Sequence, residues 1–358
     1  MDTTAQDIKF NDNGICNYCS NFIDRKNNLT KKENLDELIY KIKKDGKNKR
    51  YDCIIGVSGG VDSSFSLIKA CEQGLRPLAV HLDNGWNSEL AQNNISNLIR
   101  KCNVDLYTHV INWKEYRNLQ NAFFKSNVLD VELLMDNAML AVNYQQANKY
   151  KIKYILSGTN TATEGFKIPE NWSWFKNDAK NIKIIAKKFS NQKLKTFPTF
   201  GTFNFIYYEL VKKIKWVLFP DYFKYIKKDA LTELKQKVNY KPYPYKHYES
   251  VFTRFYQAYI LPKKFGIDKR KLHLSNLIIS NQMTRNDALK ILQSPTYSTA
   301  EDEKKDMEYF LKKMKWSEKD LSKYISDAEV SHSFYGSEKQ LWNFLAKIYK
   351  KLKFIKKI

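Results

Sequence analysis

Cysteine is scarce in this chain: there are five among 358 residues, and only Cys16 and Cys19 lie close together. This number and spacing exclude a disulfide framework. The sequence also lacks the run of about eighteen apolar residues that a transmembrane helix needs. Residues 1–7 contain no basic stretch followed by an apolar one, so we expect no signal peptide. These absences predict a cytoplasmic protein without a membrane span.

Acidic residues are few relative to basic ones, with 38 Asp and Glu against 61 Lys and Arg, which gives a formal net charge of +23. Such a charge attracts polyanions: nucleic acid, an acidic membrane surface or a nucleotide-linked substrate. The lysines are spread over nearly every segment, so a general compositional bias explains the charge equally well. A hydrophobic content of 43% and an aromatic content of 14% indicate a folded chain, long enough for two domains.

Between residues 51 and 157 the sequence alternates short apolar runs with helix-like stretches, which is typical of parallel strands joined by crossover helices. We predict strands at 52–57, 77–83, 105–111 and 154–157, and helices at 62–73, 89–101 and 132–149. This pattern predicts an α/β fold with a doubly wound parallel sheet. Helix-start patterns indicate a helical C-terminal region; they begin at Thr284, Ser317 and Ser337.

Three regions are therefore expected. Residues 1–50 form a cysteine-containing leader and linker, and residues 51–200 form the nucleotide-binding α/β domain. Residues 201–358 form the helical region, which we expect to bind substrate and partner. Residues 200–225 are strongly aromatic and basic. We interpret them as an amphipathic helix packed on the sheet or on a partner, in preference to a segment that lies on a membrane.

The most informative segment is Ser58-Gly-Gly-Val-Asp-Ser-Ser64, which follows the first predicted strand and opens the first predicted helix. A glycine-rich turn at a helix N-terminus presents backbone N–H groups to an anion. Gly59 and Gly60 let the backbone approach phosphate oxygens closely. We interpret Asp62 as a helix cap or a magnesium ligand. Hydroxyl donors come from three serines: Ser58, Ser63 and Ser64.

This loop lacks the Gly-Lys-Ser/Thr ending of a Walker A motif. It resembles the SGGxDS loop of the N-type ATP pyrophosphatases, the PP-loop family. The resemblance implies that ATP is cut between its α- and β-phosphates, that pyrophosphate is released and that the substrate is left adenylated. We expect catalysis to depend on Asp62 and Ser63.

Polar residues follow two other predicted strands, at the edge where an open parallel sheet binds its ligands. Asp83 and Asn84 end the second strand, which lies beside the adenosine in PP-loop proteins, so both are candidates for the base or ribose. An ordinary Asn-Gly turn is the alternative. A second glycine-containing loop follows the fourth strand, and three of its residues are candidates for holding the α-phosphate: Gly158, Thr159 and Asn160.

Further distinctive segments accompany Ser58–Ser64, which we call the phosphate loop. They are residues 1–4, 13–19, 81–86, 157–160, 164–167, 246–256, 261–270, 273–275 and 282–285. With them the chain resembles, over most of its length, the N-acetyl sugar amidotransferases of surface-polysaccharide and flagellin-sugar biosynthesis. The phosphate loop alone is specific only to the superfamily. Its combination with the Lys-Arg segment near residue 270 is much more specific.

This resemblance implies the formation of an amidine, with ATP and Mg²⁺ as cofactors. AMP would be transferred to the carbonyl oxygen of an acetamido group on a nucleotide-linked or nonulosonic-type sugar. Ammonia would then displace AMP, so that C=O becomes C=NH. A partner glutaminase subunit would supply the ammonia, with an ammonia-channelling, cyclase-like subunit as a further candidate partner. The candidate ligands of a substrate phosphate or carboxylate are Lys167, Lys269 and Arg270.

Cys16 and Cys19 have the spacing of zinc ligands, but a structural zinc site normally needs four. In the resembling family a second Cys-x-x-Cys pair commonly precedes the Asp-Thr-Thr segment, which here lies at residues 2–4. Zinc is therefore a prediction that rests on one pair of thiols.

Two other functions stay open at this point. One is a PP-loop enzyme that modifies tRNA, and the other is a non-catalytic basic protein that binds nucleic acid. Nucleic acid is the less favoured partner, because the sequence shows no recognisable RNA-binding domain and no cysteine set for sulfur transfer.

Overall fold

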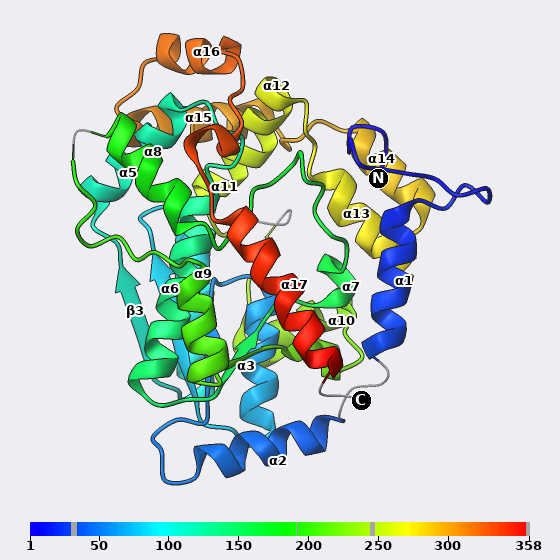
Figure 1. Cartoon of the computed structure of the whole chain (residues 1–358). Helices are drawn as coiled ribbons and strands as arrows, with labels where there is room; N and C mark the ends of the chain where they lie inside the picture. Colours follow the sequence, from blue (N-terminus) through cyan, green and yellow to red (C-terminus); the bar gives the residue numbers. More distant parts are fainter. Residues whose placement is uncertain (30–33, 191, 244–247, 356–358) are drawn as a thin grey trace.

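The computed structural model describes residues 1–29, 34–190, 192–243 and 248–355 (Figure 1). At its centre is one sheet of five parallel strands in the order β3-β2-β1-β4-β5. The strands are β1 (Cys53–Gly56), β2 (Pro77–Asp83), β3 (Leu106–Val110), β4 (Tyr154–Ser157) and β5 (Lys215–Leu218). The strand order reverses between β1 and β4, so the loops after these two strands meet at the switch point of the sheet.

Helices cover both faces of this sheet, because β1, β2 and β4 are buried on both sides. One face packs against α2 (Leu35–Gly46), α3 (Val61–Glu72), α4 (Glu89–Cys102) and α10 (Lys227–Val238). The other face packs against α6 (Leu133–Lys149), α9 (Thr202–Phe205) and the π-helical turns Ile206–Val211. Neighbouring residues of β1 point into opposite cores, Ile55 into the first and Ile54 into the second. The predicted doubly wound α/β fold is confirmed.

A third apolar core joins the C-terminal helices to this α/β part. It is formed by α5 (Trp113–Lys125), α8 (Ala179–Phe189), α11 (Val251–Phe255), α12 (Leu261–Phe265), α13 (Arg270–Ile279), α15 (Ala300–Met314) and α16 (Glu318–Ser326). Trp86, just after β2, is fully buried in it, and its ring centroid lies 5.4 Å from those of both Trp113 and Phe252. The end of β2 therefore anchors the C-terminal region. The N-terminal helix α1 (Asn17–Leu29) joins through Phe22, which packs on Phe166 at 5.6 Å.

Every strand and helix predicted between residues 51 and 157 lies within one residue of its predicted bounds. Thr284 and Ser317 cap α14 (Arg285–Gln293) and α16, as the sequence predicts. The third predicted start, Ser337, lies two residues before α17 (Lys339–Ile355). The sequence does not predict α5, α8, α10 or the fifth strand.

Residues 200–225 are helical only in part. The helical stretch 202–211 packs Phe205 and Tyr208 on the sheet, which confirms the interpretation as a packed amphipathic helix. Residues 215–218, by contrast, form β5, so the chain beyond residue 200 contributes to the sheet. The proposed domain boundaries themselves stay predictions.

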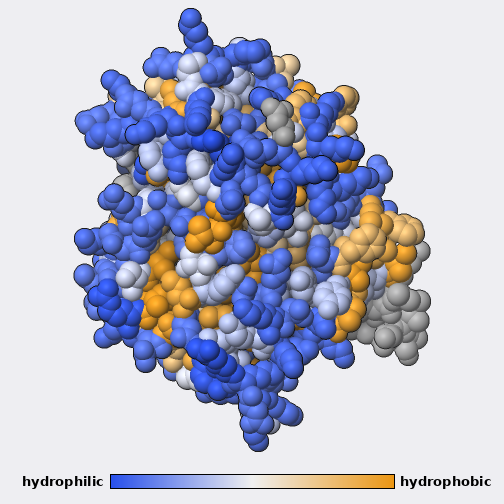
Figure 2. Space-filling model, turned by 90° about the vertical axis from the view of Figure 1, so that its left-hand side faces the viewer, coloured by the Kyte–Doolittle hydropathy of each residue, from blue (hydrophilic) through white to orange (hydrophobic). Residues whose placement is uncertain are grey.

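Hydrophilic side chains dominate the face seen in Figure 2, with hydrophobic patches between them. Among the residues that the structure describes, no helix is long and apolar enough to span a bilayer.

Candidate functional site

The phosphate loop joins β1 to α3 at the carboxyl edge of the sheet. Gly60 is the N-cap residue of α3, and no side chain of the described residues caps this helix. The N–H groups of the first turn are therefore left for an anion. Gly59 has a φ of +82°, and a Cβ at this position would lie 2.8 Å from the carbonyl oxygen of Ala91 in α4. Only glycine fits here, and the loop joins a strand end to a helix start as its sequence predicts, while anion binding stays a prediction.

Serine hydroxyls hold the loop from within. Ser63 Oγ donates to the carbonyl of Gly60 at 3.2 Å and lies 3.3 Å from Ser58 Oγ. The backbone N–H of Gly60 donates to Ser58 Oγ at 3.3 Å. Ser58 is exposed, whereas Ser64 is fully buried. Of the three predicted hydroxyl donors, Ser64 is thus the one that lies inside the helix packing.

The loop after β4 packs directly on the phosphate loop. A Cβ on Gly158 would lie 2.6 Å from the backbone nitrogen of Ser63, so the two backbones touch where no side chain fits. Asn160 Nδ2 donates to Asp62 Oδ1 at 3.3 Å. Thr159 is exposed at the rim. The structure therefore brings Gly158, Thr159 and Asn160 beside the phosphate loop, as we predict from the sequence.

Asp62 lies in the first turn of α3 and is not its cap, which removes one of the two interpretations of this residue. Its Oδ1 accepts hydrogen bonds from the hydroxyl of Tyr225 and from Asn160. No described residue donates to Oδ2, so one carboxylate oxygen stays open to a hard cation such as Mg²⁺. Burial, and then the Asp62 carboxylate, raise the pKa of Tyr225, which keeps its hydroxyl a donor.

Two further tyrosines hold the loop from the opposite side. The hydroxyls of Tyr240 and Tyr243 both donate to the carbonyl oxygen of Gly59, at 2.8 and 3.0 Å. Burial raises the pKa of both. The sequence analysis did not predict these roles. The unusual Pro/Tyr-rich composition of segment 240–245 was the available indication, and the last two residues of that segment lie outside the described part.

His81 connects the end of β2 to the phosphate loop. Its Nδ1 donates to the carbonyl of Val57 at 2.8 Å, and its Nε2 accepts from Asn87 Nδ2 at 2.9 Å. Because a carbonyl oxygen can only accept, the proton of the neutral ring lies on Nδ1. The His81 side chain in β2 therefore holds Val57, the residue just before Ser58, in place.

The two candidates for adenosine binding face different surroundings. Asp83 accepts from the N–H of Gly85 at 2.9 Å and lines an open cavity of about 550 Å³ between α4 and the β2–β3 edge. Asn84 is buried and accepts from the N–H of Trp86 at 3.1 Å. Only Asp83 therefore faces space that a ligand can enter, while Asn84 shapes the turn.

A second cavity, of about 300 Å³, is lined mostly by residues of the C-terminal helices; we call it the C-terminal cavity. Its apolar wall comes from Leu274, Leu277 and Ile291, and its polar and basic lining includes Lys227, Tyr248, Thr253, Arg254, Gln257, Lys269 and Arg270. Thr163 lines it as well and donates its N–H to Asn160 Oδ1 at 2.8 Å. Next to Tyr248, Glu249 Oε1 would lie 3.2 Å from a Cβ on Gly60. The cavity wall is therefore linked to the phosphate loop at two points. Thr163 is bonded to Asn160, which contacts Asp62, and Tyr248 precedes Glu249, which lies beside Gly60.

Two of the three predicted substrate ligands line the C-terminal cavity, but both are also bound within the protein. Lys269 Nζ pairs with Glu132 at 2.8 Å. Arg270 forms a bidentate pair with Asp268 and donates from Nη1 to the carbonyls of Ile291, Ser294 and Pro295 at 2.9–3.2 Å. It therefore ties the end of α14 to the start of α13. Lys167 is exposed, pairs with Glu170 at 3.1 Å and lies outside the cavity wall.

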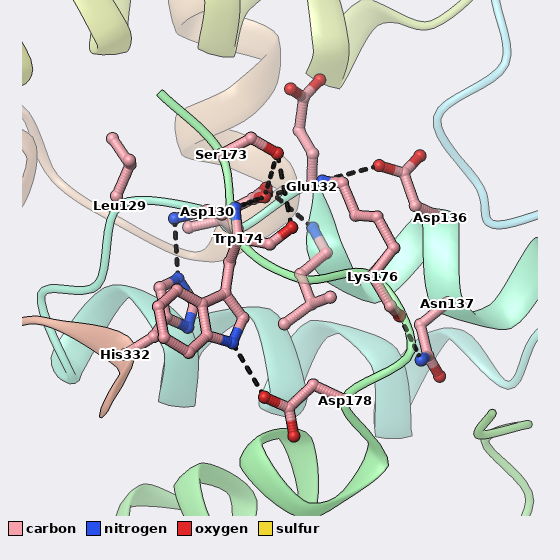
Figure 3. Close-up of polar contacts among 12 residues, drawn as sticks. Leu129, Asp130, Glu132, Asp136, Asn137, Ser173, Trp174, Lys176, Asp178 and His332 are labelled. Atoms are coloured by element: carbon pink, nitrogen blue, oxygen red, sulfur yellow. Dashed lines mark hydrogen bonds and ion pairs between the residues drawn. The ribbon is translucent and has the colours of Figure 1, made fainter. Parts of the chain in front are cut away.

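A buried ionic cluster adjoins this wall (Figure 3). Asp130 accepts hydrogen bonds from Ser173 Oγ, the N–H of Trp174 and Lys176 Nζ at 3.0, 2.7 and 2.6 Å. Burial alone would raise the pKa of Asp130, but the ammonium groups of Lys176 and Lys269 hold it well below its usual range. Glu132 binds Lys269 and Gln257, both of which line the cavity. The cluster therefore supports one wall of the cavity.

His332, from the C-terminal region, is bonded to this cluster. Its Nε2 accepts from the N–H of Asp130 at 3.0 Å, and its Nδ1 donates to Asn181 Oδ1 at 2.8 Å. The ring of Trp174 stacks on the imidazole with centroids 4.9 Å apart (Figure 3). Burial lowers the pKa of His332 to about 3, so the ring is neutral. This set of contacts is structural.

Cys16 and Cys19 lie side by side, with their sulfur atoms 3.4 Å apart. Within the described ranges, no group of three or more His, Cys, Asp or Glu side chains is placed to hold a metal ion. The pair supplies two of the four ligands that a structural zinc needs, and zinc stays a prediction.

Residues 249–349 match the family model described as "LPS biosynthesis protein WbpG-like, C-terminal domain". The C-terminal region of this chain is similar to that WbpG-like domain. This assignment confirms the sequence resemblance to proteins of surface-polysaccharide biosynthesis. The WbpG-like domain begins at Glu249, beside the phosphate loop, and supplies most of the wall of the C-terminal cavity.

Among solved structures, the chain is similar to an NH3-dependent NAD synthetase from Campylobacter jejuni subsp. jejuni NCTC 11168 in complex with the nitrate ion. The identity is 13%, the match covers 60% of this chain and 93% of that one, and the TM-score is 0.29. An NMN synthetase from Francisella tularensis matches at 15% identity over 61% of this chain and 100% of its own, with a TM-score of 0.23. These values are too low to support a functional inference. No curated protein matches the chain significantly.

Sequence reasoning also missed three cavity residues of the WbpG-like domain: Thr253, Arg254 and Gln257. Thr253 and Arg254 lie in segment 246–256, which carries part of the family resemblance and whose first two residues lie outside the described part, and Gln257 follows it directly. That resemblance was the available signal. It could not separate the residues that face the cavity from those that face the apolar core.

Proposed function

We propose that this protein is an ATP-dependent, AMP-forming amidotransferase that converts an acetamido group of a sugar to an acetamidino group. One observation supports the proposal: an uncapped, glycine-rich loop at a helix N-terminus lies near a cavity whose wall comes mostly from a region similar to the WbpG-like domain of lipopolysaccharide biosynthesis. The loop accounts for the use of ATP, and the domain accounts for a sugar as the acceptor.

The triphosphate of ATP binds the phosphate loop in this proposal. The free N–H groups of the first turn of α3 and the positive end of its dipole stabilise the negative charge of the departing pyrophosphate. The loop after β4 completes the site through Thr159 and Asn160, and Asp83 contacts the adenosine. Mg²⁺, when bound to Asp62, would neutralise phosphate charge further.

The acceptor sugar occupies the C-terminal cavity. A volume of about 300 Å³ suits one sugar ring with its substituents. Leu274, Leu277 and Ile291 offer an apolar surface for an acetamido methyl group, and Tyr248, Thr253 and Gln257 offer polar contacts. Lys269 and Arg270 line the same wall, and their ion pairs with Glu132 and Asp268 fix its shape.

The chemistry has two steps. The acetamido carbonyl oxygen attacks the α-phosphorus, the bond to pyrophosphate breaks, and the sugar carries AMP on that oxygen. Ammonia then attacks the same carbon, the C–O bond breaks, and AMP leaves with the former amide oxygen. After loss of a proton the product has C=NH where the substrate had C=O. A partner glutaminase subunit supplies the ammonia, and a cyclase-like subunit is the candidate for channelling it.

The test combines the protein with ATP, magnesium, an ammonium salt and a panel of diacetamido sugar nucleotides. AMP and pyrophosphate should form only with the correct sugar, and mass spectrometry should find NH in place of O in the product. ADP and phosphate as products would contradict the mechanism. A salt-dependent mobility shift of labelled tRNA at physiological ionic strength, without any sugar reaction, would favour a tRNA-modifying enzyme instead.

Two loop variants and one control make this test specific. Asp62→Ala and Ser63→Ala should abolish AMP formation while the thermal unfolding transition remains cooperative. Asp229→Ala removes an exposed carboxylate from the first turn of another helix, α10, and should leave the rate unchanged. Full activity in either loop variant would contradict the assignment of the site.

A further inference from the structure

The helix that forms one wall of the C-terminal cavity changes its winding at the cavity. Residues 251–265 are continuously helical and consist of α11, the π-helical turn Tyr256–Ile260 and α12. Four residues of this helix line the cavity: Thr253, Arg254, Gln257 and Ala258. π-helical turns within α-helices occur frequently at functional sites. The cavity side of this helix is therefore a candidate for contacts with the acceptor.

Gln257 carries a hydrogen-bond acceptor of fixed orientation. Its Nε2 donates to both carboxylate oxygens of Glu132, each at 3.0 Å. Because a carboxylate can only accept, the amide nitrogen faces Glu132 and Oε1 lies on the other side of the amide group. Glu132 is itself held by Lys269 at 2.8 Å. No described residue donates to Gln257 Oε1, so this oxygen is left for a donor on a ligand in the cavity.

Thr253 lies one helical turn before Gln257 and has an unsatisfied hydroxyl. The residue is 4% exposed, and its Oγ1 has no hydrogen-bond partner in the part of the chain that the structure describes. A buried polar group without a partner lowers stability. Threonine populates two rotamers in a helix, so the hydroxyl can turn toward a polar ligand without giving up a bond. A ligand in the cavity can therefore supply the missing partner.

We propose that Gln257 and Thr253 recognise an acetamido group of the acceptor sugar, an inference that rests on the proposed function. A secondary amide has one donor, its N–H, and one acceptor, its carbonyl oxygen. Gln257 Oε1 accepts from the N–H, and the hydroxyl of Thr253 donates to the carbonyl. A donor on the reacting carbonyl oxygen would withdraw the electron density that attacks the α-phosphorus. The group recognised by this pair is therefore an acetamido group that does not react.

The test measures sugar binding by isothermal titration calorimetry without ATP. It uses the panel of diacetamido sugar nucleotides and, for comparison, UDP-N-acetylglucosamine, which has one acetamido group. The unaltered protein should bind a diacetamido sugar about tenfold or more tightly than the comparison sugar. Thr253→Val replaces the hydroxyl by a methyl group and should bind the diacetamido sugar about tenfold more weakly, because the amide carbonyl loses its donor. Thr253→Ser keeps the hydroxyl and should restore most of the affinity.

Thr202→Val is the matched control. The hydroxyl of Thr202 is also buried and without a partner among the described residues, but Thr202 is not one of the residues that line the cavity. Both valine variants should be at least as stable as the unaltered protein in urea denaturation, since each removes an unsatisfied hydroxyl. Only Thr253→Val should lose sugar affinity. Gln257→Met should also bind the sugar about tenfold more weakly.

Four outcomes would overturn the proposal. They are unchanged sugar affinity in Thr253→Val or in Gln257→Met, an equal loss of affinity in Thr202→Val, and a loss of stability in Thr253→Val that shows its hydroxyl to be bonded within the protein. Failure of every panel sugar to bind the unaltered protein would also contradict it. Sugar binding that follows the expected pattern, without AMP formation when ATP, magnesium and ammonium are added, would support this inference and contradict only the proposed chemistry.

Discussion

Gly158 and Ser63 touch through their backbones: a Cβ on Gly158 would lie 2.6 Å from Ser63 N and 2.7 Å from Ser63 Cα. The two loops at the switch point can meet only if this position has no side chain. Gly158→Ala should therefore push the β4 loop off the phosphate loop. We expect a loss of about 1–3 kcal/mol in unfolding free energy, and a raised KM for ATP in steady-state kinetics.

The control for this change is another glycine with open space around it. Gly266 has a φ of +66° and no atom within 4 Å of an added Cβ. Gly266→Ala should lower stability through backbone strain but leave the KM for ATP unaltered. An unchanged KM in Gly158→Ala would mean that the two loops do not form one site.

Tyr225 positions Asp62 by donating a hydrogen bond to one of its carboxylate oxygens. Tyr225→Phe should reduce kcat about tenfold and raise the Mg²⁺ concentration needed for half-maximal activity, since Asp62 loses its fixed orientation. Tyr335→Phe is the matched control, because that buried hydroxyl also donates a hydrogen bond, to the carbonyl of Ser126 at 3.0 Å. Both variants should lose about 1 kcal/mol of stability, but only Tyr225→Phe should change the Mg²⁺ dependence. Equal Mg²⁺ dependence in the two would rule out the positioning role.

The three guanidinium nitrogens of Arg270 all donate to groups of the protein, which predicts a structural effect larger than a binding effect. Arg270→Ala leaves Asp268 and three carbonyl groups without their donor, so we expect a loss of about 2–3 kcal/mol of stability. Lys167→Ala breaks only an exposed pair and should change stability by less than about 0.5 kcal/mol. Urea denaturation measures both. A stable Arg270→Ala variant that fails to bind the acceptor would show that Arg270 is mainly a substrate ligand.

His332 should make the protein less stable as the pH falls below about 6.5, the ordinary pKa of histidine. Its folded-state pKa is about 3, so between these values the unfolded chain takes up a proton that the folded protein does not. The stability that depends on the neutral ring is present above pH 6.5 and is lost by about 1.4 kcal/mol per pH unit below it. The pKa of Asp130 is held low by Lys176, so that carboxylate contributes only at still lower pH.

Unfolding free energies measured between pH 7 and 5 test this dependence. His332→Gln keeps an acceptor for the N–H of Asp130 and should flatten the slope while lowering stability at every pH. His109→Gln is the control, since His109 is only partly buried and its pKa is lowered less far by burial. An unchanged slope in His332→Gln would contradict the neutral, buried histidine.

The sequence predicts the sheet and its phosphate loop well because their signals are local. Ser58–Ser64 combines a strand end, a left-handed glycine and a helix start within seven residues, and the apolar period marks the strands on both sides. The strand Lys215–Leu218 has no such signal: four residues in an aromatic stretch become a strand only because β4 offers a free edge. Pairing with β4, and not the local sequence, determines that residues 215–218 form a strand.

The site is predicted least well where its parts come from distant segments. Tyr225 reaches Asp62 from 163 residues away, and Tyr243 reaches Gly59 from 184 residues away. Arg270 illustrates the opposite case, since its motif is recognisable but only the structure shows the guanidinium paired with Asp268. Residue type indicates what a side chain can bind, whereas the fold decides which partner lies within reach.

The most direct measurement follows the acetamido oxygen. The acceptor sugar identified in the substrate panel is prepared with oxygen-18 in its acetamido carbonyl and is turned over with ATP, magnesium and ammonium. If the loop after β1 directs AMP transfer to that oxygen, mass spectrometry will find the label in the phosphate of AMP and none in pyrophosphate. Label that is found in water or inorganic phosphate, or that is retained in the sugar product, would contradict the account.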